Sequence, residues 1–99
     1  MAATIAKPYV LRLYVTDASP KSARAIVNLR RLLDEHLGAR YELEILDIAE
    51  DVAQAARDQI IAIPTLVRKL PEPIRKIIGD LSNTERVLVG LQLRPARPS

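Results

Sequence analysis

The chain has 99 residues and a net charge of +3, and 48% of its residues are hydrophobic. This length suits one domain with a single modest core. The absence of cysteine excludes disulfides and thiolate metal sites, and a single histidine excludes a multi-histidine metal site. The charge is too small to indicate nucleic acid by itself, and no apolar run reaches the length of a membrane span. The first residues lack the apolar core of a signal peptide, so we expect a cytoplasmic protein.

A strand and a long helix open the predicted fold. Residues 9–15 are β-prone and nearly all apolar, which predicts a central strand buried on both faces. Ser19 is suited to an N-cap, with Pro20 at the first helical position. Apolar residues then recur at helical spacing as far as Leu37, and Gly38 predicts the end of the helix.

The rest of the chain predicts three strands and two helices. The remaining elements are, in order, a half-exposed strand at 41–47, a weaker helix at 51–58, and strands at 65–70 and 75–79. Ser82 and Glu85 match a capping box, which predicts a last helix continuing to Leu91. Both ends differ from this middle part. We predict a flexible N-terminus at 1–8, one domain over 9–93 and a flexible, basic, proline-rich tail at 94–99.

The predicted order, β-α-β-α-β-β-α, indicates a small mixed sheet with helices on its faces. The opening β-α-β unit implies a parallel strand pair. Ile63-Pro64-Thr65 stands just before a strand and resembles the proline loop of the thioredoxin fold, in which the proline is cis. The corresponding active site would lie at residues 16–20, where there is no cysteine. The fold class is therefore α/β and thioredoxin-like, without oxidoreductase chemistry.

The polar residues that could carry catalysis have simpler roles. They are three serines without a neighbouring histidine and three aspartates that follow strands: Ser19, Ser22, Ser82, Asp17, Asp47 and Asp80. Such residues more often form turns and cap helices than act in catalysis. A lone His36 near a helix end is best explained as a surface residue. The chain also has no glycine-rich phosphate loop. Together, these observations predict no catalytic residue, no metal site and no cofactor.

Charge is segregated along the chain. Residues 41–56 contain five acidic side chains and no basic one. The opposite cluster comprises Arg68, Lys69, Arg75 and Lys76, to which Arg24 and Arg30 add. A solvated surface is the ordinary explanation, and steering toward an oppositely charged partner is the functional one. Glu42 and Glu44 also suit an exposed sheet edge that must avoid random pairing.

Several stretches resemble the KaiB family of circadian clock proteins, over residues 9–93. They are residues 9–15, 19–22, 63–66 and 85–91, and above all Leu-Pro-Glu-Pro-Ile-Arg-Lys-Ile-Ile-Gly-Asp-Leu-Ser at 70–82. The resemblance implies a non-enzymatic regulator that binds the N-terminal ATPase ring of KaiC, a hexameric ATPase and autokinase. It also implies two folds. One is a resting homotetramer or other homo-oligomer ordered β-α-β-β-α-α-β, and the other is a thioredoxin-like monomer that binds KaiC. The order predicted above is that of the monomer.

The same resemblance assigns partner-binding residues. The positions implicated in KaiC binding are Arg24, Arg68, Arg75 and Lys76. The strand at 41–45 corresponds to the edge that docks KaiA in cyanobacterial members, which have a small residue and a lysine where this chain has Glu42 and Glu44. The tail at 94–99 is basic where those members carry an acidic extension. Both departures argue against KaiA as a partner and favour a system that lacks it.

Four residues are candidates for a change of fold: Pro64, Pro71, Pro73 and Gly90. Isomerisation of X-Pro bonds is slow, and these three prolines lie in the half that would refold. The residues after Ser82 fit a helix or a strand, and Gly90 weakens the helix by about 0.8–1 kcal/mol relative to alanine. An alternative function is a redox-inactive sensor or adaptor module, similar to the input domain of the clock histidine kinase.

Overall fold

A computed structural model describes residues 9–17, 19–38 and 40–92. Its elements follow the predicted order: β1 (Tyr9–Val15), α1 (Pro20–Leu37), β2 (Tyr41–Asp47), α2 (Val52–Arg57), β3 (Thr65–Leu70), β4 (Arg75–Ile78) and α3 (Thr84–Leu91). The β-α-β-α-β-β-α order is the thioredoxin-like one, not that of the resting KaiB oligomer. The predicted flexible ends, 1–8 and 94–99, lie outside the described residues.

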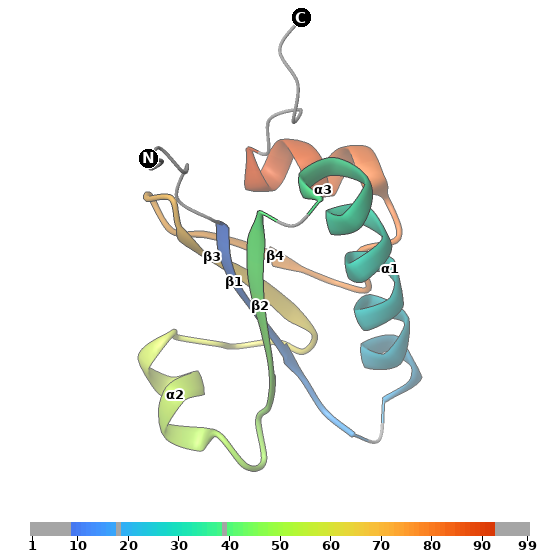
Figure 1. The fold of residues 1–99 in the computed structure, drawn as a ribbon. Coiled ribbons are helices and arrows are strands. Elements are labelled where there is room, and N and C mark those ends of the chain that lie inside the picture. The colour runs from blue at the N-terminus through green and yellow to red at the C-terminus, as the bar shows by residue number, and fades with distance from the viewer. Residues whose placement is uncertain (1–8, 18, 39, 93–99) are drawn as a thin grey trace, which may run out of the picture.

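The four strands form one sheet in the order β2-β1-β3-β4. β1 runs parallel to β2 and antiparallel to β3, which in turn pairs antiparallel with β4. β1 is therefore central, as its apolar sequence predicts, and β2 and β4 are the edges. Figure 1 shows α1 and α3 on one side of this sheet and α2 on the other.

The main core lies between the sheet and the two helices on one side of it. Leucines from α1, Leu29, Leu33 and Leu37, pack there with Leu11 and Leu13 of β1. Each is at most 1% exposed, and burying a leucine side chain contributes about 1.5–3 kcal/mol. A smaller cluster under α2 contains Tyr14, Leu46 and Val67. Because successive strand residues point to opposite faces, β1 supplies both clusters.

The ends of the helices agree with the predictions in one case and correct them in another. Ser19 caps α1, since its side chain accepts a hydrogen bond from the backbone N–H of Ser22 at 3.2 Å. The predicted cap of α3 is wrong. Asn83 caps it instead, accepting from the N–H of Arg86 at 3.0 Å. α3 begins at Thr84, so Ser82 lies one residue before the cap position, and its N–H donates to the Asp80 carboxylate at 3.1 Å.

The Ile63-Pro64 bond is cis, as in the thioredoxin proline loop, and the Leu70-Pro71 and Glu72-Pro73 bonds are cis as well. Pro71 and Pro73 lie in the turn between β3 and β4. The part that Pro64, Pro71 and Pro73 play in a change of fold stays a prediction.

Candidate functional site

Two of the four predicted binding cations stand exposed on the edge strand β4. Arg75 pairs in register with Arg68, and Lys76 with Val67. Neither Arg75 nor Lys76 forms an ion pair with any residue that the structure describes. Lys76 donates one hydrogen bond, from Nζ to the backbone carbonyl of Gln59 at 3.2 Å. Their positive charges are therefore available to an acidic partner.

These two cations lie on opposite faces of the sheet. Arg75 shares a face with Ile77, which packs against the core under α1 and α3. Lys76 shares a face with Val67, which belongs to the cluster under α2. The basic feature that the sequence predicts is therefore an edge with a cation on each side. It is not one flat patch.

From α1, Arg24 reaches the loop that follows β4. Its Nε lies 3.5 Å from Asp80 Oδ2, and its side chain is 60% exposed. Asn28, one turn further along α1, donates to the Asp80 backbone carbonyl at 2.9 Å. α1 is thus tied to the loop between β4 and α3, and the Asp80 carboxylate already neutralises part of the charge of Arg24. Exposed pairs of this kind contribute at most about 1 kcal/mol to stability.

Arg68 occupies a different environment from the other predicted binding residues. It is 2% exposed, because its place in β3 directs it to the face covered by α3. It donates to the backbone carbonyls of Leu91 and Pro73. Burial, followed by repulsion from Arg75, lowers the pKa of its guanidinium. In this fold its contacts are internal.

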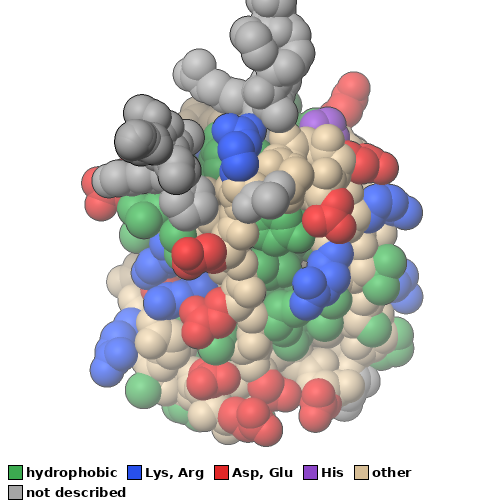
Figure 2. Space-filling view, viewed as in Figure 1, with side chains coloured by type: hydrophobic (Ala, Val, Ile, Leu, Met, Phe, Trp, Pro, Cys, Tyr) green, Lys and Arg blue, Asp and Glu red, His purple; other side chains and the backbone are tan. Residues whose placement is uncertain are grey.

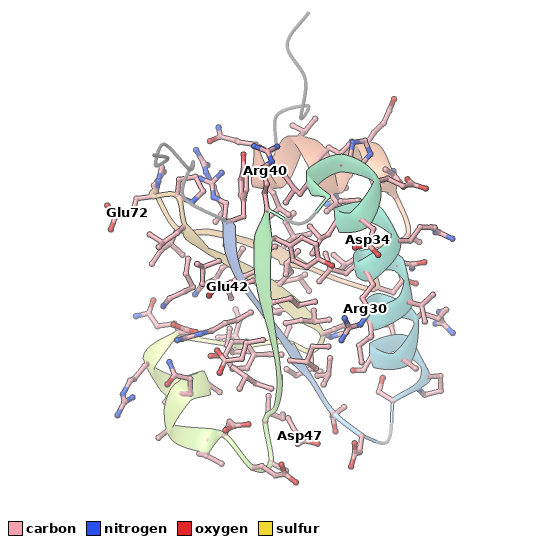
Figure 3. All side chains as sticks on the ribbon, viewed as in Figure 1. Arg30, Asp34, Arg40, Glu42, Asp47 and Glu72 are labelled. Atoms are coloured by element: carbon pink, nitrogen blue, oxygen red, sulfur yellow. The ribbon has the colours of Figure 1, made fainter. Side chains whose placement is uncertain are left out.

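The opposite edge, β2, is acidic and partly paired. Glu42 and Glu44 are exposed on the face opposite α1, and Glu44 Oε1 accepts from Arg12 Nε at 3.1 Å. Figure 3 shows Glu42 on β2, with Arg30 and Asp34 projecting from α1 on the other side of that strand. Figure 2 shows further acidic side chains gathered at the lower end of this view, below the end of β2. The two edges of the sheet thus carry opposite charge.

The sequence analysis did not identify Asp58, which sits at the centre of a charged network. Its Oδ2 accepts from Tyr14 Oη at 2.5 Å and from Arg12 Nη1 at 3.1 Å, and its Oδ1 accepts from Lys69 Nζ at 2.7 Å. Its side chain is 5% exposed. Burial opposes ionisation, but the bonds from Lys69, Tyr14 and Arg12 outweigh it and lower the pKa of Asp58. Burial of the Tyr14 hydroxyl, together with its hydrogen bond to Asp58, raises the pKa of Tyr14 to about 12.

The end of α2 places this carboxylate. Asp58 follows the last residue of α2, and Gln59 adopts a left-handed conformation with φ of 57°. The N–H of Ile60 donates to Ala55 and that of Gln59 to Ala56, which is the hydrogen-bond pattern of a Schellman motif. The four network residues come from β1, β3 and the end of α2. No local sequence signal joins them, so their contact could not be read from spacing.

An apolar groove lies beside α2. It encloses about 390 Å³ and is lined only by aliphatic side chains, among them Ile48, Val52, Ala55, Ile60 and Ile63. Ile61, which also lines the groove, is 90% exposed. Sequence reasoning did not single out these residues, because an aliphatic run before a strand is typical of a core.

The described residues contain no group of three histidines, cysteines or carboxylates able to hold a metal ion. No helix in the described part of the chain has the length and apolar character needed to cross a bilayer. The strongest chemical features are instead surfaces: a basic edge, an acidic edge and an apolar groove. Such features are typical of protein–protein contact.

The comparisons with known proteins agree with this view. The KaiB domain family model matches residues 12–93. The chain is 48% identical to the circadian clock protein KaiB3 of Synechocystis sp. over 86 residues, covering 87% of this chain and 84% of that protein. It is 47% identical to the circadian clock oscillator protein KaiB of Microcystis aeruginosa over 87 residues, covering 88% and 84%.

Solved structures support the fold. The N-terminal domain of Synechococcus elongatus SasA superposes with a TM-score of 0.73 at 20% identity, covering 93% of this chain and 90% of that one. Fasciola hepatica thioredoxin gives a TM-score of 0.69 at 15% identity, covering 86% and 79%. At these identities the likeness concerns the thioredoxin-like fold alone.

Proposed function

Because the chain belongs to the KaiB family of circadian clock proteins, we propose that it binds the N-terminal ATPase ring of a KaiC-like hexameric ATPase. Members of this family are clock regulators rather than enzymes. The observation that carries the proposal is the exposed pair Arg75 and Lys76, unpaired among the described residues, within the stretch most specific to the family. Arg24 of α1 adds an exposed cation beside Asp80, in the loop that follows β4.

Charge reversal at the basic edge tests this function. We expect Arg75→Glu with Lys76→Glu to slow association with a KaiC-like ring about tenfold or more and to weaken its salt dependence, since steering acts mainly on the association rate. The matched control is Arg31→Glu with Arg57→Glu, which reverses two exposed cations elsewhere, on α1 and α2. Both double variants change the net charge equally, so a general charge effect would slow both.

Association rates measured at low and high salt decide the outcome, with circular dichroism confirming that each variant is folded. Equal rates for the wild type and the Arg75/Lys76 variant would show that the β4 edge is not the binding surface. Equal slowing in both variants would show that net charge, and not this edge, sets the rate.

We propose that KaiA is not a partner. The edge strand β2 presents Glu42 and Glu44, where the family resemblance implies a small residue and a lysine in members that bind KaiA, and Glu44 is already paired with Arg12. A partner surface adapted to a lysine is acidic. An edge that carries glutamates repels such a surface, and a glutamate that is already paired is not available to it. This supports a system without KaiA, or one with a different output.

We further propose that the chain exchanges between this fold and a resting homo-oligomer, with Gly90 in the segment that refolds. Here Gly90 lies in α3, and a Cβ added to it would lie 2.7 Å from Ile77 Cδ1 and 3.1 Å from Ile77 Cγ1. Helix propensity alone predicts that Gly90→Ala favours the helical monomer about fivefold. The contact with Ile77 opposes that gain, so in the wild-type background Gly90→Ala should shift the population toward the monomer by less than about fivefold.

Shortening Ile77 separates the two effects. In an Ile77→Val background, which removes Cδ1, Gly90→Ala should recover the roughly fivefold shift toward the monomer. Size-exclusion chromatography and backbone chemical shifts measure the two populations. If Gly90→Ala favours the oligomer in both backgrounds, helix propensity at Gly90 does not set the balance.

A further inference from the structure

Arg68 carries a buried positive charge without a carboxylate partner among the described residues. It is 2% exposed, and none of the ion pairs in the described part of the chain includes it. Its Nε is buried and has no hydrogen-bond partner among the residues that the structure describes. Burying a cation is costly unless other groups compensate the charge. In the described part of the chain, the compensation for Arg68 therefore comes from neutral groups around it.

Those groups are two backbone carbonyls from separate parts of the fold. Arg68 Nη1 donates to the carbonyl of Leu91, and Nη2 donates to the carbonyl of Pro73 at 2.8 Å. Leu91 is the last residue of α3, where the carbonyls are left without partners inside the helix and carry partial negative charge. Pro73 belongs to the turn between β3 and β4. One side chain thus joins β3, the end of α3 and that turn.

We propose that Arg68 is an internal positioning residue that holds the end of α3 and the proline turn against β3, and thereby fixes the strand that presents Arg75 and Lys76. Its effect on partner binding rests on the proposed function, whereas its effect on α3 does not. The Leu91 carbonyl stands free for Arg68 because α3 ends there. The buried charge of Arg68 therefore favours the arrangement in which residues 84–91 are helical.

Amide hydrogen exchange of the full chain without any partner tests the internal role. Arg68→Met keeps an apolar stem and removes both donors, so exchange in the last turn of α3 should become at least about tenfold faster. Arg68→Lys, which keeps the charge with one donor group, should give a smaller increase. Arg75→Met is the matched control, because it removes the cross-strand neighbour's charge at an exposed position. It should leave α3 exchange nearly unchanged.

The same variants distinguish positioning from direct contact. If Arg68 acts internally, Arg68→Met slows association with a KaiC-like ring while the salt dependence stays that of the wild type, and Arg75→Met reduces that dependence. Unchanged exchange in α3 after Arg68→Met would overturn the proposal, as would a reduced salt dependence matching that of Arg75→Met. If Arg68→Met does not fold, Arg68→Lys decides by the same two measurements. A wild-type chain that binds no such ring would contradict the proposed function and leave the exchange result standing.

Discussion

Replacing Asp58 by asparagine is expected to lower the free energy of unfolding by about 3 kcal/mol, the low end of the range for breaking a buried ion pair. The substitution removes the negative charge that faces Arg12 and Lys69 and weakens the acceptor of the Tyr14 hydroxyl. The low end applies because Arg12 and Lys69 keep 23% and 26% of their side chains exposed, so water compensates part of the loss. Urea unfolding followed by circular dichroism measures the difference.

Glu44→Gln is the matched control for that experiment. Glu44 pairs with the same Arg12 guanidinium at the same 3.1 Å, but its side chain is 59% exposed, so its loss should cost less than about 1 kcal/mol. Equal costs for the two substitutions would show that the buried network contributes nothing beyond a surface pair.

The pH dependence of Asp58→Asn follows from the lowered pKa of Asp58. The folded state binds the Asp58 proton less tightly than the unfolded state, so the stabilisation is present above the ordinary value of 3.8 and is lost as pH falls through the folded pKa. The wild type should therefore lose stability in acid more steeply than Asp58→Asn.

Tyr14 should produce an alkaline loss of stability of about 2–3 kcal/mol, since its pKa rises from 10.0 to about 12 and each unit corresponds to about 1.4 kcal/mol. Here the folded state binds the proton more tightly. The stabilisation is therefore complete below pH 10 and is lost as pH rises through about 12. Tyr14→Phe has no proton to lose, so this alkaline decline should disappear.

Tyr41→Phe controls for tyrosine titration in general. The Tyr41 hydroxyl also donates to a carboxylate, Asp34 Oδ1 at 2.8 Å, but that bond lies at the exposed surface. The alkaline decline should persist in Tyr41→Phe. The ultraviolet absorbance of tyrosinate should show a last titration step in the wild type, which has three tyrosines. That last step should be absent in Tyr14→Phe. An unchanged last step in Tyr14→Phe would assign it to another tyrosine.

The elements could be predicted because their signals are local. Ser19, Pro20 and Gly38 mark the ends of α1, and the alternation in residues 41–47 defines β2. The cap of α3 could not be resolved from spacing, since Ser82 and Asn83 both have capping side chains. In the structure α3 begins at Thr84, which puts Asn83 at the cap, while Ser82 lies in the preceding turn with its N–H bonded to the Asp80 carboxylate. Asp80 is held in turn by Asn28 and Arg24 of α1, which precede it by 52 and 56 residues along the chain.

The sequence by itself determined the order of the elements, the exclusion of thiol chemistry and the membership of the KaiB family, since these depend on composition, periodicity and contiguous motifs. Only the tertiary structure decided what each charge does. It buried Arg68 under α3, left Arg75 and Lys76 exposed on opposite faces of β4, and brought Asp58 to Arg12, Tyr14 and Lys69. The physical reason is that the accessibility and partners of a side chain depend on strand register and on which layer covers each face. Both are set by contacts between residues far apart in the chain.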